Sequence, residues 1–212
     1  MIRMMDCNRL QGKFIVLDGP DGCGKSTQVR LLSEVISGCG FEHITLCDPG
    51  GSDIGRQIRA ILLDNANVAM SWRCESLLYM ASRAQLYSQR IAPALAERRC
   101  VICDRWLSST CAYQGVAGGL GDAFVLELAN IALERPWPDL TIIIDLPCDQ
   151  GLLRLGDTPD RVESRSIDYH RKVREGFLSL AGDRGDFCVV DGAGSIDQVH
   201  QRICRVIQEY DF

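Results

Sequence analysis

The fold of this chain of 212 residues is decided by one stretch, Phe14-Ile15-Val16-Leu17-Asp18-Gly19-Pro20-Asp21-Gly22-Cys23-Gly24-Lys25-Ser26-Thr27. Its first five residues form an apolar run that is typical of a buried strand. Residues 19–27 match the pattern G-x-x-x-x-G-K-[ST], and the segment after them has a helical pattern. A strand, a glycine-rich loop and a helix in this order are the context in which the pattern binds phosphate groups.

The residue types of the loop explain that chemistry. Its glycines let backbone N–H groups turn inward around phosphate oxygens, and the following helix adds the positive end of its dipole. We expect Lys25 to reach the β- and γ-phosphates of a nucleoside triphosphate and the Ser26 hydroxyl to bind Mg²⁺. All nine residues 19–27 are therefore predicted to bind the triphosphate, but they do not identify the acceptor.

Further along the chain, short apolar runs alternate with longer segments of helical pattern. The runs are continuously apolar, which suits a parallel sheet with helices on both faces. The alternation predicts one α/β doubly wound domain over 1–212, with ligands beyond the carboxyl ends of its strands. The five expected strands are 13–18, 43–46, 100–104, 140–145 and 187–191. The expected helices lie near 25–38, 53–63, 74–97, 121–134, 148–155, 164–182 and 195–209.

Composition narrows the classes of function. Hydrophobic residues make up 46% and charged residues 24% of the chain, and the mean hydropathy is -0.01, which indicates a globular domain rather than a disordered one. The net charge of -5 gives no reason to expect nucleic acid or an anionic membrane as a partner. No apolar run approaches the roughly 18 residues needed to cross a membrane.

The eleven cysteines are odd in number and scattered along the chain. The N-terminus lacks the apolar segment and cleavage site of a secretory signal, so we expect free thiols in a reducing cytoplasm. Cys100 and Cys103 form a C-x-x-C motif inside an expected strand. Residues three apart on a strand point to opposite faces, and we therefore expect neither a metal site nor a redox role for this pair.

Three further groups of polar residues accompany the expected strand ends. Asp21 lies inside the loop, either as a solvated turn residue or as an acceptor for a hydroxyl of a second substrate. Asp104 and Arg105 end the third strand, where they would support Mg²⁺ and bind phosphate or form a surface ion pair. Arg56 and Arg59 are one helical turn apart, and they either clamp an acceptor phosphate or face solvent.

These motifs, in this order, resemble the thymidylate kinase family in its bacterial type, from about residue 13 to the C-terminal helix. Residues 104–115 read Asp-Arg-Trp-Leu-Ser-Ser-Thr-Cys-Ala-Tyr-Gln-Gly, and they match the family pattern D-R-(Y/H/W)-x-x-S-x-x-A-Y-Q at every fixed position. Shorter matches are residues 48–52 (against E-P-G-G-T), 78–85 (the base-pocket helix), 138–141 and 160–163. Five ordered matches are far more specific than a phosphate loop alone.

The resemblance implies transfer of the γ-phosphate of ATP to dTMP, which gives dTDP and ADP. It implies a five-stranded P-loop domain of the nucleoside monophosphate kinase type, with a short lid at 150–165. Lys25, Ser26 and the loop backbone would hold ATP and Mg²⁺, and Asp104 would support the metal. Arg105 would contact the phosphates of both nucleotides. The lid arginines expected to share catalysis are Arg154 and Arg161.

For dTMP the resemblance implies a pocket with assigned contacts. Asp21 would bind the 3′-hydroxyl and Arg59 the phosphate. Tyr79 would stack on thymine, while Arg83 would donate to its O4. Tyr113 beside the sugar would exclude a ribose 2′-hydroxyl, although either tyrosine on its own would equally suit the core. The other residues expected in this pocket are Asp48, Arg105, Ser109, Thr110, Gln114 and Glu163.

The sequence departs from the family pattern at three places. Gly22 stands where one type of thymidylate kinase carries a catalytic arginine, so the resemblance implies that the lid supplies this charge. Cys47 replaces an arginine, and Asp48 replaces a longer glutamate. The lid is about two residues short, and the basic residues in it or just beyond it are Arg154, Arg161 and Arg165.

Two other functions fit these departures. One is a phosphate-loop nucleotide-binding protein with little kinase activity, and the other is a kinase of another nucleoside monophosphate. The retained Asp21, Arg83 and Arg105 disfavour both, because a protein that only binds a nucleotide needs no acceptor pocket. Family membership also implies a homodimer packed through helices. For residues 1–11 two interpretations stay open: a flexible tail, or a start of translation at Met4 or Met5.

Overall fold

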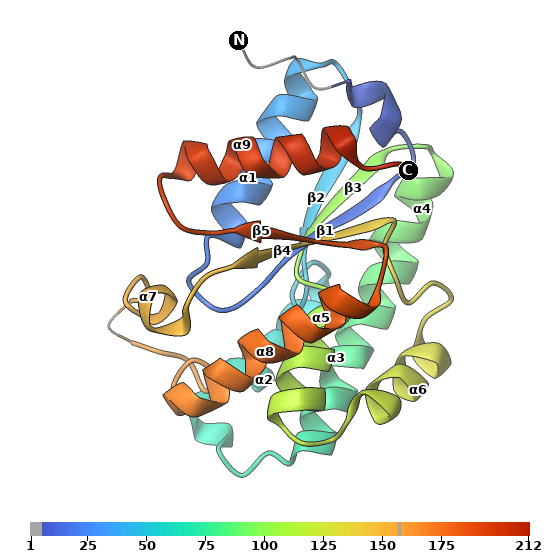
Figure 1. The fold of residues 1–212 in the computed structure, drawn as a ribbon. Coiled ribbons are helices and arrows are strands. Elements are labelled where there is room, and N and C mark those ends of the chain that lie inside the picture. Colours follow the sequence, from blue (N-terminus) through green and yellow to red (C-terminus); the bar gives the residue numbers. More distant parts are fainter. Residues whose placement is uncertain (1–5, 157) are drawn as a thin grey trace.

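The computed structural model describes residues 6–156 and 158–212 (Figure 1). Its centre is one sheet of five parallel strands in the order β2-β3-β1-β4-β5. This confirms the predicted α/β fold, and three of the five strands have the predicted bounds. The strands are β1 (Phe14–Asp18), β2 (His43–Cys47), β3 (Cys100–Asp104), β4 (Leu140–Asp145) and β5 (Phe187–Asp191).

Strand β1 lies in the middle of the sheet. Its Leu17 pairs with Asp104 of β3 on one side and with Ile142 of β4 on the other. Every residue of β1 is buried, as expected of a strand covered on both faces, whereas in the edge strand β2 only Leu46 is buried. Because all strands run the same way, Asp18 and Asp104 end at one edge of the sheet. The glycine-rich loop therefore lies beside Arg105.

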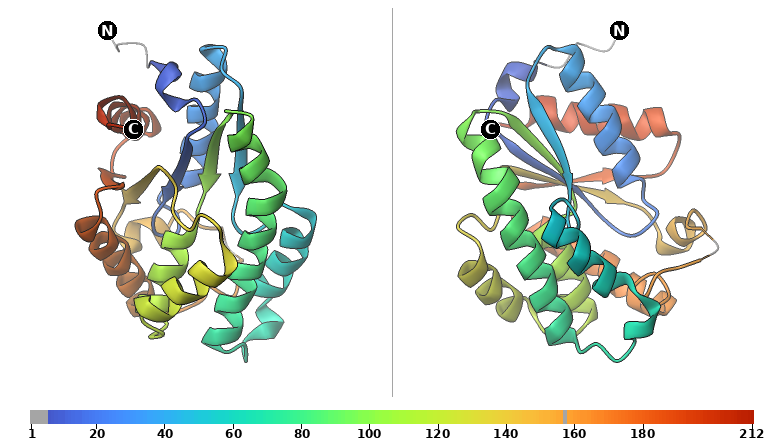
Figure 2. Two further views of the ribbon diagram at one scale, coloured as in Figure 1. Left: turned by 90° about the vertical axis from the view of Figure 1, so that its right-hand side faces the viewer. Right: turned by 180° about the vertical axis from the view of Figure 1, so that it is seen from behind.

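Helices cover both faces of the sheet (Figure 1, Figure 2). They are α1 (Lys25–Gly38), α2 (Asp53–Leu63), α3 (Trp72–Leu86), α4 (Ala92–Ala96), α5 (Leu107–Thr110), α6 (Asp122–Ala132), α7 (Cys148–Leu152), α8 (Ile167–Asp183) and α9 (Ile196–Glu209). On one face, Leu32 of α1 and Ile203 of α9 share a core with Ile15. Helices α3, α4, α6 and α8 cover the other face. Within the described residues, no helix combines the length and apolarity needed to span a bilayer.

Two helical segments differ from the predictions. Helix α5 continues into a π-helical turn, η4 (Cys111–Ala117), where no helix is expected from the sequence. Serine, threonine and cysteine have modest helix propensity, and tertiary contacts stabilise this segment instead: the Ser108 hydroxyl donates to buried Asp18 at 2.6 Å. A second π-helical turn, η3 (Tyr87–Ile91), divides the helix expected near 74–97 into α3 and α4.

The N-terminal segment is folded from residue 7, which corrects the expected flexible tail. It forms a short 3-10 turn, η1 (Cys7–Leu10), whose cysteine and leucine side chains are buried. Arg9 donates to the backbone oxygens of Gln208 at 2.6 Å and Tyr210 at 2.5 Å, at the end of α9. The expectation of a tail is thus wrong for η1, while residues 1–5 lie outside the described part of the chain.

The cysteines agree with the predictions in part. Cys7 and Cys39 form a disulfide between η1 and the end of α1, so the expectation of free thiols is wrong for this pair, and the other nine cysteines are free. The prediction that the two cysteines of the C-x-x-C motif point to opposite faces of the sheet is confirmed. Cys100 packs into the core on the α1 face of the sheet and Cys103 into the core on the opposite face, which prevents them from sharing a ligand.

Candidate active site

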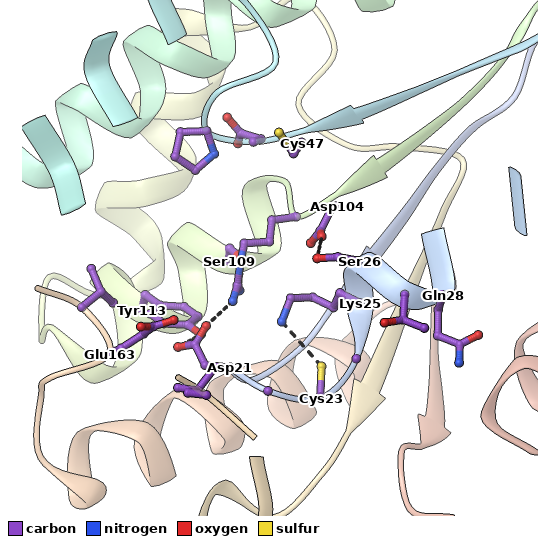
Figure 3. Close-up of a pocket in the computed structure, with 18 of the residues that line it drawn as sticks. Asp21, Cys23, Lys25, Ser26, Gln28, Cys47, Asp104, Ser109, Tyr113 and Glu163 are labelled. Atoms are coloured by element: carbon purple, nitrogen blue, oxygen red, sulfur yellow. Dashed lines mark hydrogen bonds and ion pairs between the residues drawn. The ribbon is translucent and has the colours of Figure 1, made fainter. Parts of the chain in front are cut away.

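A cavity of about 880 Å³ opens at the carboxyl edge of the sheet, beside the ends of β1 and β3 (Figure 3). Its walls come from the glycine-rich loop, the start of α1, residues 47–63, α3, residues 104–114 and the lid. Of the predicted site residues, all of which are described, only Gly19, Pro20 and Arg161 do not line it. Segments that are far apart in the sequence thus form one site.

The phosphate loop between β1 and α1 supplies donors to this cavity. Gly22 and Gly24 have φ angles of 73° and 100°, in the left-handed region that glycine adopts readily. Lys25 Nζ folds back over the loop and donates to the backbone oxygens of Gly19 at 3.0 Å and Pro20 at 2.7 Å. The first turn of α1 also lines the cavity. Its backbone N–H groups and the lysine together suit the binding of phosphate.

Ser26 and Asp104 face each other across the loop, as Figure 3 shows. The Ser26 hydroxyl donates to Asp104 Oδ2 at 2.5 Å and so joins the start of α1 to the end of β3. A hydroxyl and a carboxylate oxygen side by side are hard ligands of the kind that Mg²⁺ prefers. Among the described residues there is no cluster of three His, Cys, Asp or Glu side chains for a metal. A magnesium ion here would therefore need phosphate and water ligands as well, which is usual for this ion.

Arg105 lies between the phosphate loop and the acceptor side. Its guanidinium donates to the Asp21 carboxylate and, at 3.2 Å, to the Gly19 backbone oxygen. The Tyr113 hydroxyl donates to the other Asp21 oxygen at 2.8 Å, so the interpretation of Asp21 as a solvated turn residue is wrong. Burial alone would raise the pKa of Asp21, but the charges of Arg105 and Lys25 and the Tyr113 hydrogen bond hold this pKa below its usual value.

Asp18, at the end of β1, was not predicted as a site residue, but its carboxylate binds several groups around Arg105. It is fully buried and accepts hydrogen bonds from the Ser108 hydroxyl at 2.6 Å, the Ser109 hydroxyl at 2.7 Å and the Gly19 backbone N–H at 2.9 Å. Arg105 Nη1 lies 3.6 Å from the same carboxylate. The sequence did contain a signal for this role, because Asp18 is a charged residue at the end of an apolar strand, directly before the phosphate loop.

The acceptor side is formed by Tyr79 and Arg83 of α3 and by Thr110 and Gln114 of the 107–117 helix. Arg83 is buried, and its Nε donates to Asp48 Oδ2 at 2.7 Å. Burial raises the pKa of Asp48, while the Arg83 charge opposes that shift. Asp48 lines the cavity as predicted, but one of its oxygens is engaged by Arg83 and so serves to fix this guanidinium.

The two arginines of α2 separate in the structure. Arg59 lines the cavity, and its Nη1 donates to the Pro49 backbone oxygen at 3.0 Å. Arg56 instead forms an exposed ion pair with Asp53 and does not line the cavity. Cys47, where the family usually has an arginine, lines the cavity at the end of β2. Of the two, Arg59 is therefore the one placed to meet an acceptor phosphate.

The lid brings one of its two predicted arginines to the cavity. Arg154 lines it, and its Nη1 lies 3.4 Å from the Gly22 backbone oxygen, to which it donates. Arg161 is buried in the wall, where its Nη1 lies 2.7 Å from Glu75 Oε2. Contrary to the prediction, Arg161 therefore does not line the cavity, because this ion pair holds its guanidinium away. Residue 157 of the lid lies outside the described residues.

The donor side extends further than the sequence indicates. Five residues that were not predicted line it: Gln28, Gly192, Gly194, Ile196 and Val199. They come from α1, from the loop after β5 and from the start of α9. Four of them are glycine, isoleucine or valine and Gln28 belongs to no motif, so the sequence carries no signal for them, and only the sheet order brings the last four beside the phosphate loop.

Comparison with known proteins shows to which family the chain belongs. Residues 17–203 match the family model of thymidylate kinase. A thymidylate kinase of Caldanaerobacter subterraneus is 40% identical over 203 residues, which cover 95% of this chain and 97% of the relative. That of Symbiobacterium thermophilum is 42% identical over 198 residues, or 92% of each chain. The crystal structure of thymidylate kinase from Ehrlichia chaffeensis matches with a TM-score of 0.76 and 26% identity, over 93% of this chain and 99% of that one. The chain therefore belongs to the thymidylate kinase family.

Proposed function

We propose that this chain transfers the γ-phosphoryl group of ATP to dTMP, which gives dTDP and ADP. The observation that carries the proposal is the position of Arg105, whose guanidinium is bonded to the phosphate loop at Gly19 and to Asp21 beside the acceptor side. A fixed cation at this point can neutralise the phosphates of both nucleotides where they meet. Membership of the thymidylate kinase family supports the same reaction.

On the donor side, different residues bind the phosphates, hold the metal and exclude water. The loop N–H groups and Lys25 bind the phosphates and position the γ-phosphoryl group for in-line transfer. Ser26 and Asp104 would hold Mg²⁺, which supplies further neutralisation of phosphate charge when bound. Arg154, which reaches the loop at Gly22, adds a positive charge from the lid and helps to exclude water, which would otherwise accept the phosphoryl group.

On the acceptor side, the residues present one group for each part of dTMP. Arg59 meets the 5′-phosphate, Asp21 accepts from the 3′-hydroxyl, and Tyr79 provides a flat face for the base. Tyr113, whose hydroxyl donates to Asp21 at 2.8 Å, would lie beside the sugar and exclude a 2′-hydroxyl. Arg83 donates to O4 of the pyrimidine.

The test is a coupled ADP-release assay with ATP, Mg²⁺ and each nucleoside monophosphate in turn. The expected result is the highest kcat/KM with dTMP and no turnover once Mg²⁺ is chelated. Tight ATP binding without turnover of any monophosphate would leave a nucleotide-binding protein. A clear preference for a monophosphate other than dTMP would assign a different kinase.

Two further properties belong to this proposal. The chain works as a homodimer, and the exposed apolar side chains of Ile54 on α2, Leu77 on α3 and Ile131 on α6 support packing through these helices. Its place is the cytoplasm, which the nine free cysteines support. Sedimentation of the purified chain tests the first property, and fractionation of cells that express it tests the second.

A further inference from the structure

Glu75 is a buried carboxylate on the cavity side of α3 that the mechanism above does not use. It is fully buried and lies one helical turn before Tyr79 and two turns before Arg83. Its oxygens divide between two sets of donors. Oε1 accepts from Gln114 Nε2 at 2.7 Å, whereas Oε2 lies 2.7 Å from Arg161 Nη1 and 2.6 Å from Arg165 Nη2.

The partner of Oε1 fixes the orientation of a pocket residue. A carboxylate only accepts hydrogen bonds, whereas a glutamine amide has one face that donates and one that accepts. Gln114 must therefore turn its NH₂ group toward Glu75, which leaves Gln114 Oε1 as the acceptor for a ligand. Gln114 lines the cavity, and no described residue donates to this oxygen.

The two arginines prevent Glu75 from rearranging. Arg161 is buried and is held by its own Nε, which donates to the Leu62 backbone oxygen at 2.7 Å. The guanidinium of Arg165 lies over the ring of Trp72, at 4.1 Å from its centroid. These fixed donors keep Oε2 on their side, so that Oε1 remains the atom that faces Gln114.

The base pocket consequently presents one donor and one acceptor. Arg83 can only donate, and Gln114 presents its oxygen. This pair complements a 4-oxo pyrimidine, whose O4 accepts and whose N3–H donates, as in thymine and uracil. Cytosine has the reverse pattern, because its 4-amino group donates and its N3 accepts.

We propose that Glu75 is a positioning residue that sets base specificity: it orients the Gln114 amide so that the site selects 4-oxo pyrimidine nucleotides over cytosine nucleotides. This inference rests on the proposed function, with dTMP as the acceptor. The arrangement also makes a sharp prediction for an amide at position 75. The oxygen of that amide must face the two arginines, so its NH₂ faces Gln114, and Gln114 must then reverse and offer its own NH₂ to the base.

The experiment compares wild type, Glu75→Gln and the exchanged pair Glu75→Gln with Gln114→Glu. In Glu75→Gln, kcat/KM for dTMP relative to dCMP is expected to fall by about tenfold or more. The change should appear mainly as a higher KM for dTMP, with an unchanged KM for ATP. In the exchanged pair, the carboxylate at 114 is again only an acceptor toward N3–H, so the dTMP preference returns. Glu34→Gln, which removes an exposed charge on α1, is the matched control. It leaves kcat/KM for dTMP relative to dCMP, and the KM for dTMP, unchanged.

Each outcome decides the inference. An unchanged dTMP to dCMP ratio in Glu75→Gln overturns it, as does an equal loss for both bases that the exchanged pair does not repair. If Glu75→Gln does not fold, the exchanged pair, which keeps the net charge, must still prefer dTMP. If the wild type does not phosphorylate dTMP, the proposed function fails. In that case, calorimetric titration of dTMP and dCMP into the same variants still tests the orientation of Gln114.

Discussion

Gly22 of the phosphate loop and Gly151 of α7 pack backbone against backbone. A Cβ atom on Gly22 would overlap the Gly151 carbonyl oxygen, and one on Gly151 would overlap the backbone oxygen of Asp21. Arg154, one turn beyond, donates to the Gly22 oxygen at 3.4 Å. The base of the lid thus rests directly on the loop. No arginine fits at position 22, and an arginine of the lid approaches the same place from the other side.

Replacing Gly22 with alanine should therefore damage both stability and activity. The residue has a φ of 73°, so alanine adds backbone strain to the clash, and we expect a loss of about 2 kcal/mol or more. Urea unfolding measures the loss, and the assay above should show a higher KM for ATP. Gly38→Ala is the control, because a Cβ there meets nothing within 4 Å and the residue lies in α1. Equal stability of the two variants would contradict the packing argument.

The two lid arginines should separate activity from stability. Arg154 is exposed and reaches the loop, so Arg154→Ala should lower kcat by about 10²-fold or more at unchanged Tm. Arg161 is buried against Glu75, so Arg161→Ala should cost about 2 kcal/mol or more of unfolding free energy. Thermal unfolding and steady-state kinetics of both variants provide the check. A normal kcat in Arg154→Ala would remove it from the reaction.

The sheet was predictable because its signal is local. A buried strand such as β4 contains an uninterrupted apolar run, Ile142–Ile144. The pattern of the phosphate loop predicted the strand before it and the helix after it. The 107–117 helix was not predictable, since most of its residues are Ser, Thr, Cys, Tyr, Gly or Val, which have modest helix propensity. It depends on the contact of Ser108 with Asp18, which joins residues 90 positions apart in the chain.

Site residues divide in the same way. Family motifs identified Asp21, Arg83 and Arg105, and all three line one cavity. The destination of Arg161 could not be read from the sequence, because both lid arginines have the same chemistry and only the position of Glu75 distinguishes them. A buried ion pair between Arg161 and a residue of α3, far from it in the sequence, is a property of the packing and not of any motif.

Two substitutions of Arg105 separate the effect of its charge on catalysis from the effect of its backbone conformation on stability. Its φ is 70°, a conformation that is costly for a residue with a Cβ. Arg105→Ala and Arg105→Gly both remove the guanidinium, and both should lower kcat by about 10³-fold. Glycine relieves the strain, so Arg105→Gly should be more stable than Arg105→Ala by about 1 kcal/mol. Kinetics and urea unfolding of the pair measure the two effects. Near-normal turnover in either variant would contradict the role of Arg105 between the nucleotides.

Asp21 makes stability depend on pH in a predictable direction. Its pKa in the folded protein lies below its usual value of 3.8, despite its burial, because of Arg105, Lys25 and the Tyr113 hydrogen bond. The unfolded chain therefore binds more protons between the two pKa values, and stability rises with pH through this window. Asp21 thus stabilises the fold fully above pH 4 or so and loses this effect as the pH falls through the lowered pKa.

Accordingly, Asp21→Asn should be less stable than the wild type at pH 7, and the difference should shrink as the pH falls below about 4. Urea unfolding of both proteins at a series of pH values down to 3.5 measures it. Asp53→Asn, which removes an exposed ion pair with Arg56, is the control and should change stability little at any pH. A difference between wild type and Asp21→Asn that stays constant or grows toward acid would mean that the carboxylate is not stabilised by its neighbours.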